Sequence, residues 1–202
     1  MKSYLFCSLK ERIAISIRFK NVTKTCKNYK NIKKLYHTAF PAEERVPFWF
    51  LMAKSKGKNA RFYSVYEKET WVGFVYIVSY QDIRYVFYLA VSEKERGEGY
   101  GSKILKKITE KYQNKRIILL IEPLDKNADN YKERVNRKNF YEKNGFYDLH
   151  YQVLEKNVIY SALGYGNRVS KKEYLLLIKN YLGKILFALY YNKVGFMKDR
   201  EA

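Results

Sequence analysis

The chain has 202 residues, of which 47% are apolar, and only three of them are prolines. This length and composition favour one packed domain with a short appendage and exclude an intrinsically disordered chain. The net charge of +20 fits an anionic partner, namely nucleic acid, a membrane surface or a phosphorylated ligand. The favoured explanation is a composition rich in Lys, Tyr, Asn and Ile, as coding biased toward A and T produces, with the charges on solvated faces.

Two cysteines, Cys7 and Cys26, and two histidines, His37 and His150, match no metal-ligand or disulfide spacing. We therefore expect no metal and a reduced, cytoplasmic protein. Residues 1–12 contain too short an apolar stretch for a secretion signal and are expected to lie outside the core fold. No window offers about 18 uninterrupted apolar residues, so we also expect no membrane span.

Hydrophobic periodicity predicts the elements of the N-terminal half in chain order. A strand is expected at 13–22, a helix at 26–40, a short helix at 46–58 and two strands within 60–80 that meet in a turn at 67–70. A continuous apolar run at 84–91 is typical of a central strand that is buried on both faces.

The C-terminal half is predicted to contain three helices and three strands. A helix at 102–112 precedes a buried strand at 116–123, and a helix at 130–146 precedes strands at 147–154 and 157–163. Capping boxes are expected at Asn130 with Glu133 and at Ser170 with Glu173, and Gly145 stands where a left-handed C-cap belongs. A last helix is predicted at 170–191.

These elements predict an α/β (α+β) fold. The helix at 102–112 lies between two buried strands, so a right-handed parallel β-α-β crossover is expected at the centre of a mixed, mostly antiparallel sheet. The extra C-terminal helix is amphipathic and is expected to pack against the sheet or against a second copy of the chain in a homodimer. Its apolar stripe consists of Tyr174, Leu175, Ile178, Leu182, Ile185, Leu186 and Leu189.

The stretch between the strand at 84–91 and the following helix reads RGEGYG, with glycines at 97, 99 and 101. The first amides of a helix have no partner inside it and form an anion site, which a phosphate reaches only where no side chain intervenes. Glycine removes the side chain and permits positive φ. The spacing matches neither the dinucleotide fingerprint nor the Walker loop, and three glycines are more than a tight turn needs.

This stretch resembles the R/Q-x-x-G-x-G/A loop of the GNAT superfamily of N-acyltransferases, which holds the pyrophosphate of acetyl-CoA. The preceding YLAV resembles that family's fourth strand, whose backbone pairs with the pantetheine arm, and FYEKNGF (140–146) resembles its second motif. The resemblance covers about residues 13–163 as an acetyltransferase domain and leaves 164–202 as a helical extension. It implies transfer of an acetyl group from acetyl-CoA to a primary amine by direct attack.

The resemblance also implies the cofactor-binding residues. They form three groups: residues of the strand, residues of the loop, and Arg134. Many members of the family carry an Asn at the position of Arg134. An arginine there would pair with a CoA phosphate. The expected set is Leu89, Ala90, Val91, Arg96, Gly97, Glu98, Gly99, Tyr100, Gly101, Ser102 and Arg134. No metal is implied.

Catalysis needs a base for the amine, a donor for the oxyanion and a group that stabilises the leaving thiolate. Glu122, at the end of the strand at 116–123, is our first choice of base, and Glu43 and Glu44 are alternatives in a segment that shapes the acceptor site in the family. A backbone amide near Leu89 or Val91 would bind the oxyanion. Tyr141 is expected to donate a hydrogen bond to the sulfur.

Two other functions fit the residues. A GNAT-like domain can bind acyl-CoA without turnover, as a regulator or scaffold. A basic nucleic-acid-binding protein would need exposed aromatic rings among Lys and Arg, whereas most tyrosines here fall in strand or helix stripes. We therefore expect a small-molecule or peptide amine acceptor as partner, and neither a specific nucleic acid nor a membrane.

Overall fold

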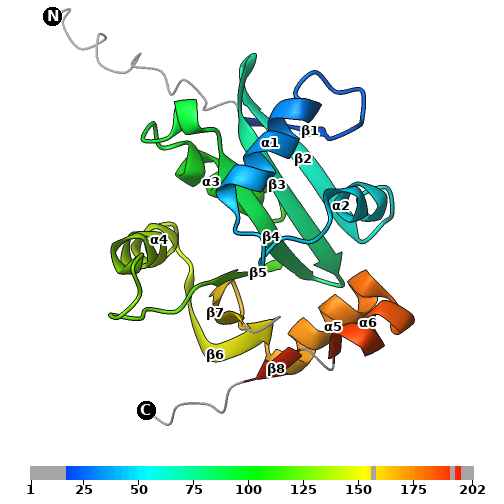
Figure 1. The fold of residues 1–202 in the computed structure, drawn as a ribbon, viewed down its shortest axis with the longest axis vertical. Coiled ribbons are helices and arrows are strands. Elements are labelled where there is room, and N and C mark those ends of the chain that lie inside the picture. The colour runs from blue at the N-terminus through cyan, green and yellow to red at the C-terminus, as the bar shows by residue number, and fades with distance from the viewer. Residues whose placement is uncertain (1–16, 156–157, 192–193, 197–202) are drawn as a thin grey trace, which may run out of the picture.

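A computed structural model describes residues 17–155, 158–191 and 194–196. One sheet runs through the described residues in the order β1-β2-β3-β4-β5-β7-β6-β8 (Figure 1). Its strands are β1 (Ile17–Asn21), β2 (Ala60–Glu67), β3 (Thr70–Tyr80), β4 (Ile83–Val91), β5 (Arg116–Ile121), β6 (Tyr147–Glu155), β7 (Val158–Tyr165) and β8 (Val194–Phe196). Only β4 and β5 pair in parallel among these strands; the other neighbours are antiparallel, which confirms the predicted mixed sheet and its crossover.

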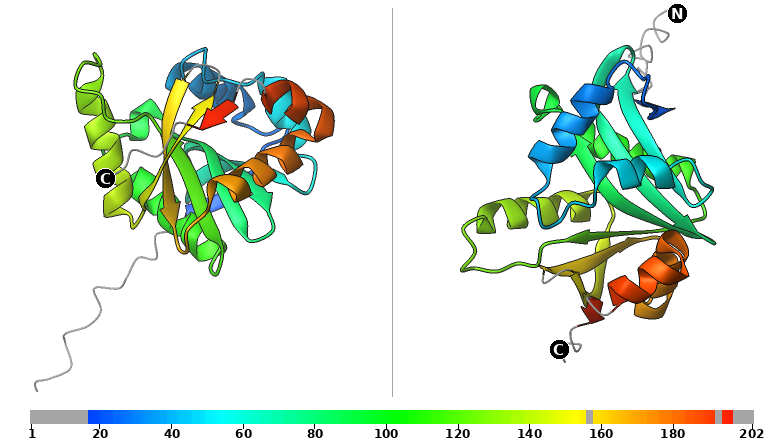
Figure 2. Two further views of the ribbon diagram at one scale, coloured as in Figure 1. Left: turned by 90° about the horizontal axis from the view of Figure 1, so that it is seen from below. Right: turned by 45° about the vertical axis from the view of Figure 1, so that its right-hand side comes forward.

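The helices cover both faces of this sheet (Figure 2). They are α1 (Tyr29–Ala39), α2 (Phe48–Lys54), α3 (Tyr100–Lys111), α4 (Tyr131–Lys143), α5 (Lys171–Leu182) and α6 (Lys184–Tyr191), and a short 3-10 turn spans Glu93–Glu95. Residues of α1, α2 and α5 share one buried cluster with the sheet, whereas residues of α3 share a second cluster on the other face, against which α4 packs. The crossover helix α3 thus connects β4 to β5 behind the sheet.

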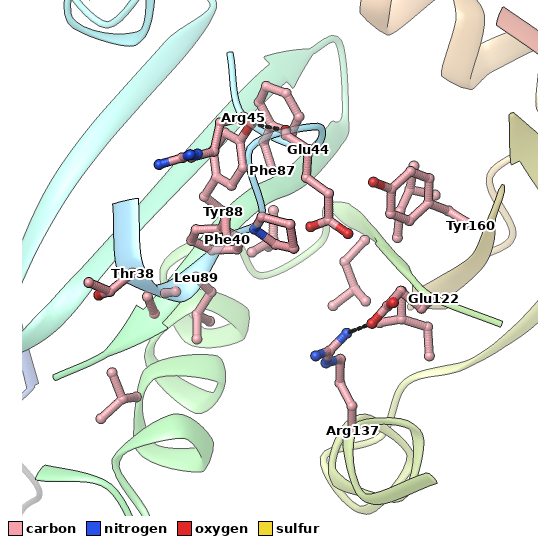
Figure 3. A pocket seen from close by; sticks show the side chains of 18 of the residues that line it. Thr38, Phe40, Glu44, Arg45, Phe87, Tyr88, Leu89, Glu122, Arg137 and Tyr160 are labelled. Carbon is pink, nitrogen blue, oxygen red and sulfur yellow. Dashed lines mark hydrogen bonds and ion pairs between the residues drawn. The ribbon is translucent and has the colours of Figure 1, made fainter. Parts of the chain in front are cut away.

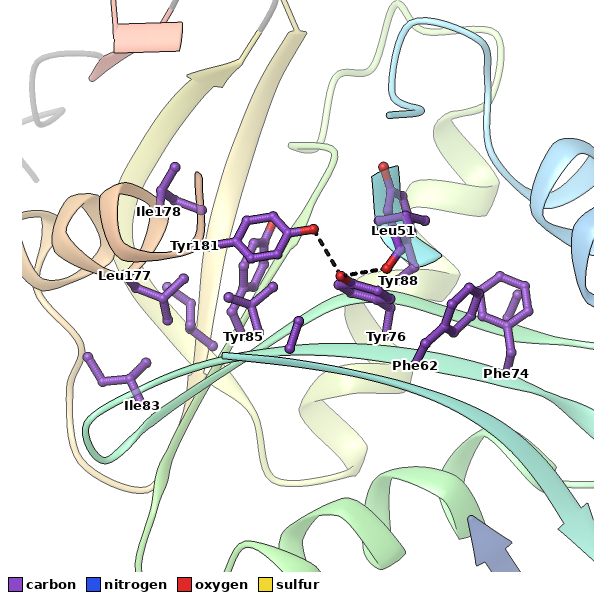
Figure 4. Close-up of a cluster of buried hydrophobic side chains, with 14 of the residues drawn as sticks. Leu51, Phe62, Phe74, Tyr76, Ile83, Tyr85, Tyr88, Leu177, Ile178 and Tyr181 are labelled. Carbon is purple, nitrogen blue, oxygen red and sulfur yellow. Dashed lines mark hydrogen bonds between the residues drawn. The ribbon is translucent and has the colours of Figure 1, made fainter. Parts of the chain in front are cut away.

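Aromatic side chains build the core between the sheet and α1, α2 and α5. Tyr76 on β3 is fully buried, and its hydroxyl lies 3.0 Å from that of Tyr181 on α5 and 3.2 Å from the Leu51 carbonyl oxygen (Figure 4). Burial of rings this large contributes much of the stability of a domain, and buried hydroxyls need such partners. Many of the tyrosines therefore serve the core.

The predicted elements lie within a few residues of the observed ones. Residues 13–16 of the first predicted strand and residue 157 of the last fall outside the described residues, as do residues 1–12. None of the described helices combines the length and the apolar character that a membrane-spanning helix needs. The boundary expected between 163 and 164 falls inside β7.

Two predictions about helix ends need correction. Asn130 precedes α4, but its side chain caps no helical amide, because its amide donates to Glu122 and its carbonyl oxygen accepts from Arg134. The helix expected at 170–191 begins with the predicted Ser170–Glu173 capping box, but it is divided at Gly183, whose φ of 84° is left-handed. The apolar stripe is accordingly buried in α5 alone, whereas Ile185 and Leu189 of α6 are 80% and 66% exposed.

Candidate active site

The central cleft arises because β4 and β5 separate along their length. They pair only at Ile83–Arg116, Arg84–Ile117 and Tyr85–Ile118, and beyond these positions no pairing joins them. A bulge at Phe87 bends β4 at the same place, where Tyr76 pairs with Tyr88 and Ile77 with Val86. A cleft of about 710 Å³ opens between the two strands, lined by residues 85–91 of β4 and 119–122 at the end of β5.

The glycine loop lies at one end of this cleft. Gly97 and Gly99 have φ of 87° and 73°, and a Cβ at either would meet no atom within 4 Å. Their left-handed backbone therefore requires glycine, and the space beside it is open. No side-chain or backbone acceptor among the described residues is recorded for the amides at 97–102, which stand at the start of α3. Amides without a recorded acceptor thus lie beside open space, and the binding of an anion there stays a prediction.

The side chains of the loop have separate tasks. Arg96 is exposed, lines the cleft and has no recorded partner within the described part of the chain. Tyr100 turns away and donates to Glu67 at 2.8 Å, and the Ser102 hydroxyl accepts from Asn144 at 3.1 Å. Glu98 is exposed. Of the loop side chains, Arg96 alone is recorded as lining the cleft.

Gly101 serves the packing of two helices. A Cβ at this position would lie 2.9 Å from the Phe140 ring of α4, closer than packed atoms approach. The sequence suggested that all three glycines give a phosphate access to the backbone. At position 101, the close approach of the Phe140 ring is by itself sufficient to explain why the residue is glycine.

Glu122, the first choice of base, is held by two arginines. Its carboxylate lies 2.6 Å from Arg137 (Figure 3). It also lies 3.1 Å from Arg134, and Asn130 donates to it as well. Burial raises the pKa of Glu122, but the hydrogen bonds from Arg137 and Asn130 outweigh burial and hold the pKa below its usual value. Arg134 also donates to the Pro123 carbonyl oxygen at 3.0 Å, so its donors point into the protein.

Glu44 lies across the cleft from Glu122, and its surroundings shift its pKa in the opposite direction. Burial raises the pKa of the Glu44 carboxyl, the charge of Glu122 raises it further, and a hydrogen bond with Tyr160 only partly opposes this. Figure 3 shows the Glu44 carboxylate and the Tyr160 hydroxyl directed toward one another. The neighbouring Glu43 is exposed and does not line the cleft.

The backbone around Glu44 is fixed by tyrosines. Tyr88 of β4 donates to the Glu44 carbonyl oxygen at 2.8 Å and accepts from the Val46 amide at 3.3 Å, and Tyr36 of α1 donates to the Val46 carbonyl oxygen at 2.7 Å. This loop connects α1 to α2 and has no regular structure of its own. The two buried hydroxyls therefore position the Glu44 side chain over the cleft.

Tyr141 also lines the cleft, from α4. Burial raises the pKa of Tyr141 to about 12, although the charge of Arg137 opposes this. No partner for its hydroxyl is recorded within the described part of the chain, and its ring packs edge-on against Phe146 at 5.8 Å. The hydroxyl can thus donate a hydrogen bond into the cleft, and its high pKa keeps the proton on it.

The structure brings seven of the fifteen predicted site residues to one cleft. Leu89, Ala90, Val91 and Arg96 line it together with Glu44, Glu122 and Tyr141. Sequence reasoning missed Tyr160 and gave Arg137 no partner. Tyr160 lies in a strand whose sequence pattern gives no functional signal. Arg137 and Glu122 are 15 positions apart, so their ion pair could not be predicted from local sequence. No group of three or more His, Cys, Asp or Glu side chains in the described ranges could hold a metal ion.

Comparisons with known proteins agree on one family. Residues 58–148 match the family model described as an acetyltransferase (GNAT) domain. These residues include β4, the glycine loop and α4, which form the walls of the cleft. No curated protein sequence matches the chain.

Solved structures show the same fold at low sequence identity. A chain from Bacteroides thetaiotaomicron, described as belonging to the GNAT family of acetyltransferases, is 22% identical with a TM-score of 0.68, over 84% of this chain and 98% of its own. A Bacillus subtilis acetyltransferase in complex with CoA is 12% identical with a TM-score of 0.52, over 75% and 97%. A dodecameric spermidine N-acetyltransferase from Vibrio cholerae is 13% identical with a TM-score of 0.55, over 79% and 96%.

Proposed function

Because this chain carries a GNAT acetyltransferase domain, and is thereby an acyltransferase, we propose that it transfers the acetyl group of acetyl-CoA to a primary amine by direct attack. The observation that carries this proposal is the separation of β4 from β5. It opens a cleft that runs from Arg96, at the start of the glycine loop, to the carboxylate of Glu44. Donor and acceptor can thus meet within one cleft.

The glycine loop fits the phosphates of CoA. Gly97 and Gly99 leave open space beside unpaired amides, and Arg96 adds an unpaired positive charge at the edge of the cleft. The separated part of β4 leaves backbone groups free for the amide groups of the pantetheine arm. The similar Bacillus subtilis structure was solved with CoA. Acetyl-CoA supplies the activated thioester.

We assign the role of base to Glu44. An amine attacks only when it is neutral, so a nearby group must take its proton. A base works best when its pKa lies near the working pH, and burial moves the pKa of Glu44 in that direction. Glu122, whose pKa is lowered by its arginines, is better suited to hold Arg137 at the cleft.

The remaining steps fall to β4 and α4. The amine nitrogen forms its bond with the carbonyl carbon, and the proton goes to Glu44, directly or through water. A backbone amide near Leu89 or Val91 binds the oxyanion. The carbon–sulfur bond then breaks, and Tyr141 donates a hydrogen bond to the thiolate. The pKa of Tyr141, about 12, exceeds the ~8.5 of an ordinary thiol, so a hydrogen bond is favoured over full proton transfer.

We propose a small-molecule or peptide amine as acceptor, in a reduced, cytoplasmic protein. Polyamines, amino sugars, amino acids and peptide amines are the classes to compare, and a polyamine is the named acceptor of the similar Vibrio cholerae enzyme. The cleft of about 710 Å³ has room for part of CoA together with a small amine.

A thiol-release assay tests the proposal. The full chain is mixed with acetyl-CoA and each amine in turn, and free CoA is measured together with the acetylated amine by mass spectrometry. We expect release that depends on one class of amine. Tight acetyl-CoA binding by calorimetry with no amine-dependent release across the panel would instead indicate a non-catalytic acyl-CoA-binding domain.

A further inference from the structure

A second groove lies on the α1 and α2 side of the molecule, outside the cleft. It has a volume of about 970 Å³ and is bounded by the segment after β1, by α1 and α2, and by the start of β2. It shares only His37 with the cleft among the residues that line the two. Figure 1 shows α1 and α2 on the same side of β2 and β3. The acetyl transfer proposed above makes no use of this groove.

An exposed tryptophan stands at the edge of the groove. Trp49, the second residue of α2, is 70% exposed, whereas its neighbours Phe48 and Met52 are buried and form part of the floor. The Phe50 ring meets Trp49 edge-on at a centroid distance of 6.0 Å and an angle of 83°. An indole in this position presents a flat apolar face to solvent, on which a planar ligand can stack.

All the residues with a full charge that line the groove are basic. Lys24, Lys33, Lys56 and Arg61 line it, and no carboxylate does. Lys24, Lys33 and Lys56 have no partner recorded within the described part of the chain, whereas Arg61 donates to neighbouring backbone carbonyls. Residues 17–62 contain twelve Lys and Arg residues but only two acidic residues, Glu43 and Glu44. The excess of ten positive charges over these 46 residues is about twice the charge per residue of the whole chain, which is +20 over 202 residues.

We propose that this groove binds single-stranded nucleic acid, with a base stacked on Trp49 and phosphates bound by Lys24, Lys33 and Lys56. Sequence-independent strand binding combines aromatic platforms with cations that follow the backbone. The three lysines stand on three different segments, so they suit successive phosphates better than one phosphate group. Among the Phe, Tyr and Trp residues whose burial the structure describes, only Trp49 and Tyr147 are exposed, and Trp49 stands among lysines as such binding requires.

Tryptophan fluorescence reports this contact directly. The chain has two tryptophans, and the other, Trp71, has a buried Nε1 for which no partner is recorded in the described residues. A Trp71→Phe protein therefore loses no recorded hydrogen bond and leaves Trp49 as the only indole. We expect a 15-residue deoxythymidine oligomer to quench its emission in a saturable way, in parallel with a rise in anisotropy of a labelled copy of the oligomer.

Two sets of variants test the groove. Trp49→Ala should weaken binding of the oligomer at least about fivefold, the effect of losing one stacked base. Replacing Lys33 and Lys56 together with Gln should weaken binding and lower the slope of log K against log salt by about 1.4. Matched changes of the exposed Lys106 and Lys143 should leave the slope within about 0.3 of the parent value. Circular dichroism checks that each variant is folded.

Three outcomes would overturn the proposal. A heparin fragment that binds as tightly as the oligomer would show that bases contribute nothing. Thymidine monophosphate that binds as tightly would indicate a pocket for a small nucleotide. Equal weakening by the groove and control lysines would show diffuse attraction to a basic protein. None of these measurements depends on acetyl transfer.

Discussion

Glu44 and Glu122 face the same cleft, yet their surroundings shift their pKa values in opposite directions. Burial, followed by the charge of Glu122, raises the pKa of Glu44. Burial acts on Glu122 as well, but there the hydrogen bonds from Arg137 and Asn130 prevail. At the scale of single residues, the partners of a carboxylate thus decide between the role of a base and that of an anchor.

Replacing Glu44 with Gln should lower turnover about 10²- to 10⁴-fold, the usual contribution of a general base, and leave acetyl-CoA binding unchanged. A base works only when ionised, and the pKa of Glu44 is raised, so activity should rise with pH as this carboxyl loses its proton. The acidic limb of the pH profile should disappear in the variant. Glu43→Gln is the matched control, and an equal loss there would contradict the assignment.

Replacing Tyr141 with Phe keeps the ring and removes one donor to a developing charge. The loss should be about 1.5–3 kcal/mol, or roughly 10- to 100-fold in turnover with a proven amine. Calorimetry should show nearly unchanged acetyl-CoA binding. Tyr131→Phe, at the start of the same helix, is the control. Turnover within twofold of the parent would show that Tyr141 only packs in the core.

At the scale of elements, the glycine loop and α3 make a prediction that separates two kinds of glycine. Gly99→Val places a side chain beside the open amides and should weaken acetyl-CoA binding. Gly101→Val would collide with Phe140 and should destabilise the fold by about 1–3 kcal/mol. Calorimetry and thermal unfolding distinguish the two effects. Unchanged affinity in folded Gly99→Val would refute the assignment of the loop.

The C-terminal helices make a second prediction at this scale. The α5 residues Tyr174, Leu177, Ile178 and Tyr181 are buried, whereas α6 leaves much of its apolar surface exposed. Truncation after Val169 should therefore lower the melting temperature by many degrees and expose Tyr76. Truncation after Leu182 should have a much smaller effect. Equal melting temperatures for the parent and the shorter chain would contradict a structural role for α5.

The elements that the sequence predicted best are those that local signals define. The capping box at Ser170 and the left-handed C-cap at Gly145 follow from neighbouring residues and are confirmed. Asn130 failed as a cap because the distant Glu122 is its partner. One continuous helix was predicted at 170–191, across Gly183, because the apolar stripe continues on both sides of this glycine. Tyr160 was missed because its place beside Glu44 depends on the tertiary fold.

For the whole molecule, the carboxylates tied to basic residues make stability depend on pH. Hydrogen bonds from Arg116, then from Ser170, lower the pKa of Glu173 to about 2, and a hydrogen bond from Arg116 lowers that of Asp82. A group whose folded pKa is lowered stabilises the fold above its unfolded pKa and loses this contribution as pH falls toward the folded pKa.

The melting temperature should therefore fall as pH is lowered from about 4.5 toward 2, and the growing excess of positive charge should add to the loss. Thermal unfolding between pH 2 and 7 measures this. Glu173→Gln should flatten part of the slope, whereas the exposed Glu110→Gln should not. A melting temperature that stays constant down to pH 2 would contradict the role of these pairs.

The separation of β4 from β5 also governs how the molecule can move. Three backbone pairings connect the two halves of the sheet, all at one end. At that end Arg116 bridges Asp82 and Glu173 at 2.7 Å each, and Lys54 reaches the Leu182 carbonyl oxygen at 3.1 Å. These contacts hold the two halves of the sheet together at the paired end of β4 and β5. Thermal separation of the two strands is therefore expected to concentrate at their unpaired end. Hydrogen–deuterium exchange should be fast at those amides of residues 86–91 that face β5, and slow once a ligand bridges the two strands.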